Sequence, residues 1–160
     1  MANSNAKTLI SMLKELKLTI STAESCTGGL IGELITDIPG ASEVYLGGII
    51  AYSNITKMKL LNIPNKILEE HTAISKETAC AMAENIKRLT GSDISISSTG
   101  NAGPTPADGK EVGEVYISVC YKNTFCERLK ADSTMSRRTI RELATNRAIE
   151  LAILSLKGEI

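Results

Sequence analysis

The sequence contains few of the residues on which several common functions depend. It has no Trp, one Phe and one His, and none of its cysteines, Cys26, Cys80, Cys120 and Cys126, lies in a C-x-x-C pair. So few aromatic residues give no platform on which nucleic-acid bases could stack. The cysteines and the His also lack the spacing of a zinc site or a disulfide framework. We therefore expect no bound metal and a reducing, cytoplasmic location.

Net charge and long apolar runs are absent as well. Lys plus Arg and Asp plus Glu number 18 each in the 160 residues, so no basic field attracts nucleic acid or an anionic membrane. No apolar run is long enough to cross a bilayer, and the N-terminus lacks the apolar stretch of a signal peptide. We expect one domain over residues 1–160, with a small-molecule partner rather than nucleic acid or a membrane.

Helix-like and strand-like patterns alternate along the chain. Apolar spacing predicts helices over residues 4–17, 28–38, 75–90 and 136–156, with a short one that carries Lys57. Alternation and β-branched residues predict strands over residues 18–22, 45–52, 93–97 and 115–121, and a shorter edge strand through residue 129. This order implies an α/β fold, a three-layer α/β/α sandwich around a mixed, mostly parallel sheet of about five strands.

Three polar loops follow predicted strands, at residues 22–29, 52–57 and 98–104. In open α/β sheets, ligands bind outside the carboxyl ends of the strands. If the three strands are parallel neighbours, their loops converge. The sequence therefore predicts a site at this edge of the sheet.

The first loop reads T-A-E-S-C-T-G-G and places two possible nucleophiles, Ser25 and Cys26, between a strand and a helix. Its geometry is similar in purpose to a nucleophile elbow. The N–H groups of Gly28 and Gly29 could bind a developing oxyanion or a phosphate. Alternatively, Ser25 and Thr27 only cap the helix, and Cys26 is a small buried residue. The local sequence leaves these alternatives open.

A serine nucleophile needs a base, and the chain offers two candidates. His71 lies between two predicted helices, where a structural hydrogen bond is the alternative role. Lys57 lies in Y-S-N-I-T-K, in the first turn of a helix whose dipole lowers its pKa. To act near neutrality its pKa must fall by roughly three units, which requires burial as well. Otherwise Lys57 is a solvated helix residue.

The loop S-S-T-G-N-A-G-P-T-P and the start of the last helix are candidate anion sites. Thr99 could hydrogen-bond a Ser or Lys partner, and Gly100 and Gly103 allow a backbone nest for an anion. Arg138 and Arg141 are spaced i, i+3 on one helix face and could grip a phosphate. The alternatives are a loop that only needs positive φ at its glycines and a solvated basic face.

Five strings occur in a distinctive order and spacing: A-E-S-C-T-G-G (23–29), Y-S-N-x-x-K (52–57), H-x-A-x-S (71–75), T-G-x-A-G-P (99–104) and R-x-x-R (138–141). Together they resemble the competence/damage-inducible CinA C-terminal domain family, over roughly residues 6–156. The chain length corresponds to the stand-alone form of that family. The resemblance implies a nicotinamide-nucleotide amidase that converts nicotinamide mononucleotide to nicotinate mononucleotide and ammonia without a metal or organic cofactor.

The resemblance also assigns roles to residues. The catalytic residues would be Ser25 as nucleophile, Lys57 as base with or without a relay through Tyr52, and Thr99 as an assisting hydroxyl. The substrate-binding residues would be Gly28, Gly29, Asn54, Gly100, Asn101, Gly103, Arg138 and Arg141. We also expect a homo-oligomer, with a dimer as one form. The alternative function is a non-catalytic nucleotide-binding module of the CinA type.

Three departures from the family pattern lie outside the catalytic strings. Thr72 stands where the family usually has Gly, and M-S-R-R replaces the common G-D-R before the last helix. The loop T-P-A-D-G-K-E after Pro104 is slightly short and lacks the usual glycine pair and acidic run. The departures therefore concern phosphate contacts and substrate choice rather than the chemistry.

Overall fold

The protein is described by a computed structural model over residues 2–160. In chain order its elements are α1 (Ala2–Leu16), β1 (Ile20–Glu24), α2 (Leu30–Thr36), the 3-10 helix η1 (Ala41–Glu43), β2 (Tyr45–Ile50), α3 (Asn54–Leu61), α4 (Asn65–His71), α5 (Lys76–Thr90), β3 (Ile94–Gly100), β4 (Glu114–Cys120), β5 (Thr124–Lys130) and α6 (Arg137–Lys157). The predicted strands and long helices are present. The short helix α4 was not predicted, because it buries only Leu68 and so shows no apolar periodicity.

The five strands form one mixed sheet in the order β2-β1-β3-β4-β5. β1 pairs in parallel with β2 and β3, whereas β3–β4 and β4–β5 pair antiparallel. The prediction of a mostly parallel sheet was wrong, because only two of the four pairings are parallel. A parallel pair needs a crossover connection, usually a helix, and no helix lies between β3, β4 and β5.

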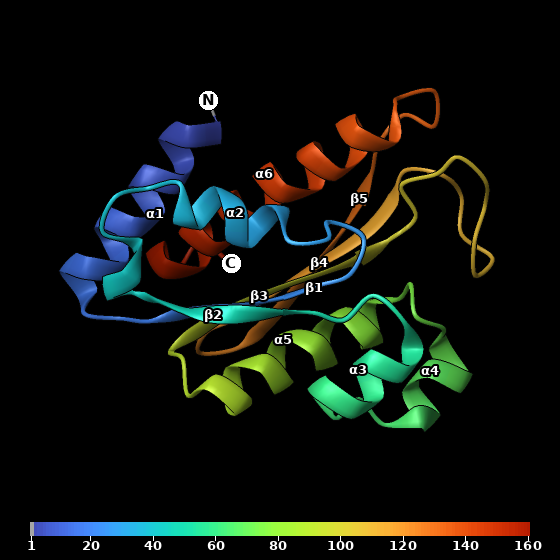
Figure 1. Ribbon diagram of the computed structural model, residues 1–160, viewed down its shortest axis with the longest axis horizontal. Coiled ribbons are helices and arrows are strands. Elements are labelled where there is room, and N and C mark those ends of the chain that lie inside the picture. The colour runs from blue at the N-terminus through green and yellow to red at the C-terminus, as the bar shows by residue number, and fades with distance from the viewer. Residues whose placement is uncertain (1) are drawn as a thin grey trace.

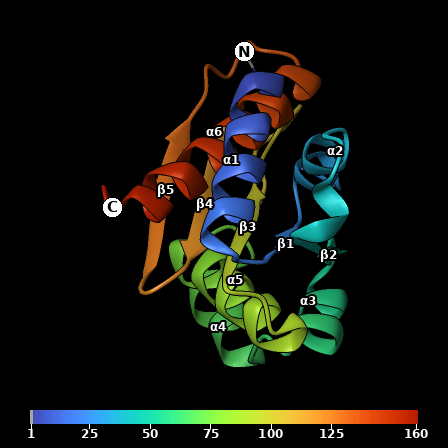
Figure 2. The same cartoon turned by 90° about the vertical axis from the view of Figure 1, so that its left-hand side faces the viewer.

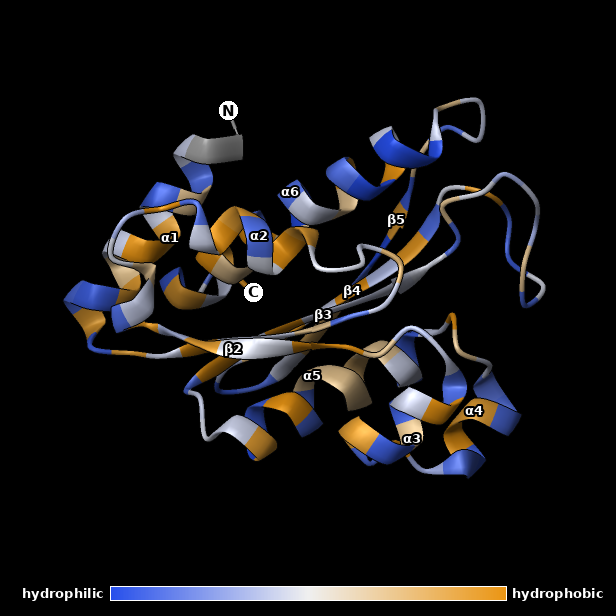
Figure 3. Cartoon of the chain, viewed as in Figure 1, coloured by the Kyte–Doolittle hydropathy of each residue, from blue (hydrophilic) through white to orange (hydrophobic). Residues whose placement is uncertain are grey.

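Helices cover both faces of the sheet. Figure 1 shows α1, α2 and α6 on one face and α3, α4 and α5 on the other, and Figure 2 shows the same layers from the side. The larger apolar core lies under α1, α2 and α6, and a smaller one lies under α3, α4 and α5. In Figure 3 the helices carry apolar stripes next to hydrophilic ones, as amphipathic helices on a sheet do.

Strand β3 joins the two cores because its side chains alternate between the faces. Ile94 and Ile96 belong to the larger core. Ser95 and Ser97 face α5, and their hydroxyls donate to α5 carbonyls at 2.6 Å. Small side chains let the helix pack closely on the strand, and the hydrogen bonds satisfy the buried hydroxyls. β3 and α5 are therefore fixed to one another where both approach the predicted site.

The three strands that precede the polar loops are parallel neighbours, which is the condition for their loops to converge. Their carboxyl ends, at Glu24, Ile50 and Gly100, lie at the same edge of the sheet. Over residues 2–160, no helix is long and apolar enough to cross a membrane. In the same range, no group of three or more His, Cys, Asp or Glu side chains could hold a metal ion.

Candidate active site

A pocket of about 360 Å³ opens where the three loops meet. Its lining includes eight of the sequence-predicted site residues: Ser25, Tyr52, Asn54, Lys57, Thr99, Gly100, Asn101 and Gly103. The other four, Gly28, Gly29, Arg138 and Arg141, do not line it. The structure therefore brings the candidate nucleophile and base together but not the arginine pair.

Lys57 is the most unusual group in the pocket, because its side chain is only 1% exposed. It lies in α3, whose N-terminus is closed by a capping box between Ser53 and Thr56. Its Nζ lies 3.0 Å from Ser25 Oγ and donates to the carbonyls of Ala51 at 2.8 Å and Tyr52 at 3.3 Å. Burial lowers the pKa of Lys57 from 10.5 to about 8, against the opposing fields of Cys26 and Asp108.

These three contacts suit both protonation states of Lys57, and the charged form can donate to all three oxygens. A neutral lysine has two N–H donors and one lone pair, whereas the charged form has three donors. The two carbonyls take the two N–H donors of the neutral Lys57. Once Lys57 has lost its proton, its lone pair can face the Ser25 hydroxyl 3.0 Å away, which is the arrangement that a base needs. The Lys57 burial that the sequence analysis required is present.

Ser25 follows the last residue of β1, and its N–H donates to the Ser98 carbonyl at 2.9 Å. This bond extends the pairing of β1 with β3 by one residue, so the serine is fixed by the sheet. Neither Ser25 nor Thr27 caps α2, since the N-cap position belongs to Gly29 at φ 102°. The alternative role of these hydroxyls as helix caps is therefore wrong.

Glu24, to which the sequence gave no role, closes the start of α2. Its buried carboxylate accepts the N–H groups of Gly29 at 2.9 Å, Ile31 at 3.1 Å and Gly32 at 2.9 Å. It also accepts the Thr27 hydroxyl at 2.6 Å. A carboxylate at a helix N-terminus satisfies the unpaired N–H groups and interacts favourably with the dipole. Glu24 therefore fixes the loop that carries Ser25.

The glycine N–H groups have other partners than those predicted. Gly29 N–H is bound to Glu24, and Gly28 N–H donates to the Ser25 carbonyl at 3.1 Å. The prediction that these two groups face an oxyanion or a phosphate is therefore not supported by the structure. The sequence did not reveal that a carboxylate of the same loop takes one of them.

Cys26 is part of the larger core and is only 5% exposed. Burial raises the pKa of its thiol to about 11. At neutral pH it is a protonated thiol, which is a poor nucleophile. Between the two adjacent candidates, the structure therefore favours Ser25.

Arg141 holds the nucleophile loop rather than a free anion. Its guanidinium donates to the Cys26 carbonyl at 3.0 Å and to the Thr27 carbonyl at 2.7 Å. A Cβ at Gly28 would lie 3.0 Å from Arg141 Nη2, and Gly28 has φ +61°. Glycine at this position therefore serves the close approach of Arg141.

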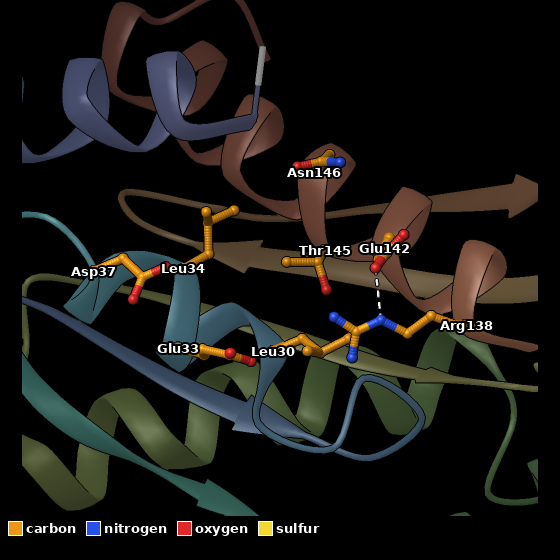
Figure 4. A pocket seen from close by; sticks show the side chains of 8 residues that line it. All are labelled: Leu30, Glu33, Leu34, Asp37, Arg138, Glu142, Thr145 and Asn146. Atoms are coloured by element: carbon orange, nitrogen blue, oxygen red, sulfur yellow. Dashed lines mark hydrogen bonds and ion pairs between the residues drawn. The ribbon is translucent and has the colours of Figure 1, made fainter.

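Arg138 faces another part of the molecule. It lines a pocket of about 290 Å³ between α2 and α6 and pairs with Glu142, one turn further along α6 (Figure 4). Glu33 and Asp37 of α2 also line this pocket. The predicted phosphate grip by Arg138 and Arg141 is therefore not supported by the structure, because each has another partner.

Arg137, which the sequence analysis missed, is the arginine that lines the Ser25 pocket. It donates to the Gly103 carbonyl at 2.6 Å and to the Tyr52 hydroxyl at 2.8 Å. The Tyr52 ring is 60% exposed, and its hydroxyl pairs with Arg137 rather than with Ser25 or Lys57. A relay through this hydroxyl is therefore not supported. Arg137 and Arg141 are spaced i, i+4 and also share a helix face, but of the three arginines only Arg137 lines the pocket, so spacing alone did not identify it.

The third loop, residues 98–104, is held by the side chains of Asn101 and Thr99. Asn101 donates to the carbonyls of Thr105 at 2.9 Å and Lys110 at 3.1 Å and accepts the Gly103 N–H at 2.8 Å. Thr99 donates to the Ala73 carbonyl at 2.6 Å rather than to Ser25 or Lys57. Both residues position the pocket wall.

The short loop after Pro104 is a tight hairpin with Asp108 at its tip. Ala107 and Lys110 exchange backbone hydrogen bonds across it, and Asp108 and Gly109 have φ 51° and 69°. Asp-Gly with positive φ at both positions is typical of a two-residue type I′ turn. Asp108 lines the pocket and raises the pKa of Lys57. The D-G pair in the sequence was the signal for this turn.

His71 lies at the end of α4 and does not line the pocket. Its ring nitrogens lie 4.0 Å from Glu70 and 3.8 Å from Glu77, and the side chain is 41% exposed. Of the two candidate bases, only Lys57 reaches the serine.

Comparison with known proteins agrees with the arrangement of loops and strands. The model of the CinA C-terminal domain matches residues 2–156. The chain belongs to the CinA C-terminal domain family. A CinA-like protein from Thermotoga maritima is 40% identical over 153 residues, which cover 94% of this chain and 36% of that protein. One from Geotalea uraniireducens is 47% identical over 114 residues, 71% of this chain and 27% of that protein. The chain thus spans about a third of the length of these CinA relatives.

Solved CinA structures share the fold. The competence/damage inducible protein CihA from Agrobacterium tumefaciens superposes with a TM-score of 0.92 at 30% identity, over 98% of this chain and 95% of that one. A competence or damage-inducible protein from Enterobacter asburiae gives 0.94 at 29% identity, over 98% of each chain. The five-stranded mixed sheet with helices on both faces is therefore the CinA arrangement.

Proposed function

We propose that this protein is a nicotinamide-nucleotide amidase of the serine-lysine type. The observation that carries the proposal is the buried Lys57 Nζ, 3.0 Å from Ser25 Oγ and bound to two carbonyls. Membership of the CinA family supports the choice of substrate, nicotinamide mononucleotide. The reaction is hydrolysis of its carboxamide to the carboxylate and ammonia.

In the first step neutral Lys57 takes the Ser25 proton while Oγ attacks the carboxamide carbon. Cys26, next after the nucleophile, lines the pocket, and its N–H makes no hydrogen bond to an oxygen within residues 2–160. It is the candidate donor to the developing oxyanion, as in other nucleophile elbows. The protonated Lys57 then gives its proton to the leaving nitrogen, and ammonia departs. Water, deprotonated by Lys57, hydrolyses the resulting ester and restores Ser25.

The charges at the pocket fit the two charges of the substrate. Nicotinamide mononucleotide carries a cationic pyridinium ring and an anionic phosphate. Among the described residues that line the pocket, the charged side chains are Lys57, Asp108 and Arg137. Arg137 stands at the N-terminus of α6, where its guanidinium and the helix dipole both favour an anion. We assign the phosphate to Arg137 and the pyridinium ring to Asp108.

Ammonia release tests the proposal directly. The purified protein is offered nicotinamide mononucleotide, nicotinamide riboside and nicotinamide in parallel. We expect turnover to be fastest with the mononucleotide, because only it provides both charges. Tight binding of the mononucleotide without ammonia release would instead indicate a non-catalytic nucleotide-binding module.

A further inference from the structure

A second group of nucleophilic side chains lies outside the Ser25 pocket. Cys80 is in the second turn of α5, which packs on β4 and β5. Cys126 is in β5, directly opposite Ser118 of β4. The Ser118 hydroxyl lies 3.8 Å from Cys80 Sγ, and Ser118 is also the register partner of Cys126, so both thiols lie beside the same side chain. Two residues 46 positions apart are thus brought together by the packing of a helix on the sheet.

The two thiols are chemically different and reachable from solvent. Both side chains are only partly buried. The neighbouring Cys126 thiol, with a smaller contribution from Ser118, lowers the pKa of Cys80 to about 7, with the Lys76 charge in support and burial and the Glu84 charge opposed. The neighbouring Cys80 thiol and burial raise the pKa of Cys126 far above its usual range. Cys80 is therefore the thiolate of the pair and Cys126 its proton donor.

We propose that Cys80 and Cys126 form a thiol–disulfide exchange site for low-molecular-weight disulfides. The Cys80 thiolate attacks one sulfur of a disulfide R–S–S–R, breaks the S–S bond and releases R–S⁻. The Cys126 thiol then loses its proton to solvent, and its sulfur attacks Cys80 Sγ in the mixed disulfide. The second R–S⁻ leaves, and a Cys80–Cys126 bond joins α5 to β5. Two electrons pass from the protein thiols to the small disulfide.

The other two cysteines, Cys26 and Cys120, could also react with a small disulfide, and the structure indicates which thiol reacts first. Cys26 is buried in the larger core, and its pKa is raised to about 11. Cys120 is partly buried on β4, and no other cysteine lies beside it in the sheet register. Since thiolate fraction and access control the rate, Cys80 should react first.

The test is incubation of the full chain with oxidised glutathione, then alkylation of remaining thiols and peptide mapping by mass spectrometry. The expected product is a Cys80–Cys126 linked peptide, with an intact mass lower by two hydrogen atoms. Cys126→Ser should stop at a glutathione adduct on Cys80, and Cys80→Ser should slow all modification by about tenfold or more. The matched control, Cys120→Ser, should behave as the unchanged protein. A persistent adduct on Cys120, or equal rates in Cys80→Ser and Cys120→Ser, would overturn the proposal.

A second measurement needs no substitution. Native alkylation with iodoacetamide, followed over pH, should modify Cys80 first, with a half-maximal rate near pH 7. The oxidised protein should also melt on the order of 10 °C higher than the reduced one, because the bond closes a long loop of the unfolded chain. Slower alkylation of Cys80 than of Cys120, or a melting temperature that does not respond to oxidation, would count against the site.

Discussion

The floor and the rim of the Ser25 pocket are built in opposite ways. The floor, Ser25 and Lys57, is 8% and 1% exposed and is tied to backbone carbonyls of β3 and of the segment after β2. The rim, Tyr52, Asp108 and Arg137, comes from a loop, a hairpin tip and the first turn of α6. A buried, fixed pair suits chemistry, because its geometry and pKa values are set by the fold. Exposed charges suit the selection of a substrate.

The largest effect that separates floor from rim is expected at the nucleophile. Ser25→Ala should lower kcat for ammonia release by roughly 10⁴-fold or more, because no other group at the floor can form the acyl-enzyme. Cys26→Ala is the matched control and should keep most of the activity, since its thiol is protonated and part of the core. The opposite ranking of the two variants would make Cys26 the nucleophile.

The next largest effect is expected for substitution of the base, Lys57. Lys57→Met should lower kcat by about 10³-fold, within the usual range for a lost general base. In the unchanged protein, kcat/KM should rise with pH through about 8, because only neutral Lys57 accepts the Ser25 proton. A flat profile between pH 6 and 10 would remove the base assignment.

Lys57→Met should also change how the free energy of unfolding depends on pH. The folded pKa of Lys57 lies below its unfolded value, so the unfolded chain binds more protons between about pH 8 and 10.5. The free energy of unfolding of the unchanged protein should therefore rise across that window, by about 3 kcal/mol relative to Lys57→Met. Urea titrations of both proteins at pH 7.5 and 10 measure the difference.

At the rim, Arg137→Gln should raise KM for nicotinamide mononucleotide by roughly tenfold to a hundredfold, the range of a lost charged hydrogen bond. Nicotinamide riboside, which has no phosphate, should be affected far less. Arg138→Gln is the matched control and should change neither, because Arg138 faces α2 and Glu142. If Arg138→Gln had the larger effect, the phosphate would lie at α2 instead.

The smallest effect is expected at the hairpin tip. On a Ser25→Ala background, Asp108→Asn should weaken the preference for oxidised over reduced nicotinamide mononucleotide by about threefold, as for an exposed ion pair. The two ligands have nearly the same shape, and only the oxidised ring is cationic. In the protein with Ser25 intact, Asp108→Asn should also move the alkaline rise of kcat/KM to lower pH, because the carboxylate raises the pKa of Lys57. An unchanged ligand preference would leave the pyridinium ring without a partner at Asp108.

The sequence predicts the floor of the pocket better than its rim. Local spacing places Ser25 at a strand end and Lys57 at a helix start, but the resemblance to the CinA family, rather than the local pattern, selects them as nucleophile and base. The rim was largely missed: the pattern favoured Arg138 over Arg137, since choosing between them needs the path of α6 across the sheet. The partner of the Gly29 N–H was missed for a related reason. The backbone of the loop folds back on Glu24, and no periodicity records that.

The antiparallel half of the sheet shows the same limit. Alternation predicted β3, β4 and β5 individually, but strand direction depends on the connections between them. Helix α4 buries a single side chain and has almost no pattern to detect. Features carried by side-chain periodicity were predicted, and features carried by chain path were not.

The Glu24 carboxylate gives the start of α2 a built-in anion. The N–H groups that a glycine-rich turn offers to a phosphate in other α/β proteins are already neutralised here by a group of the same chain. The N-terminus of α2 therefore offers no free N–H groups of Gly29, Ile31 or Gly32 to a phosphate. Nothing at this helix end favours placing the phosphate of a nucleotide over Ser25. In the proposed reaction the phosphate is therefore assigned to the rim, and the carboxamide to Ser25.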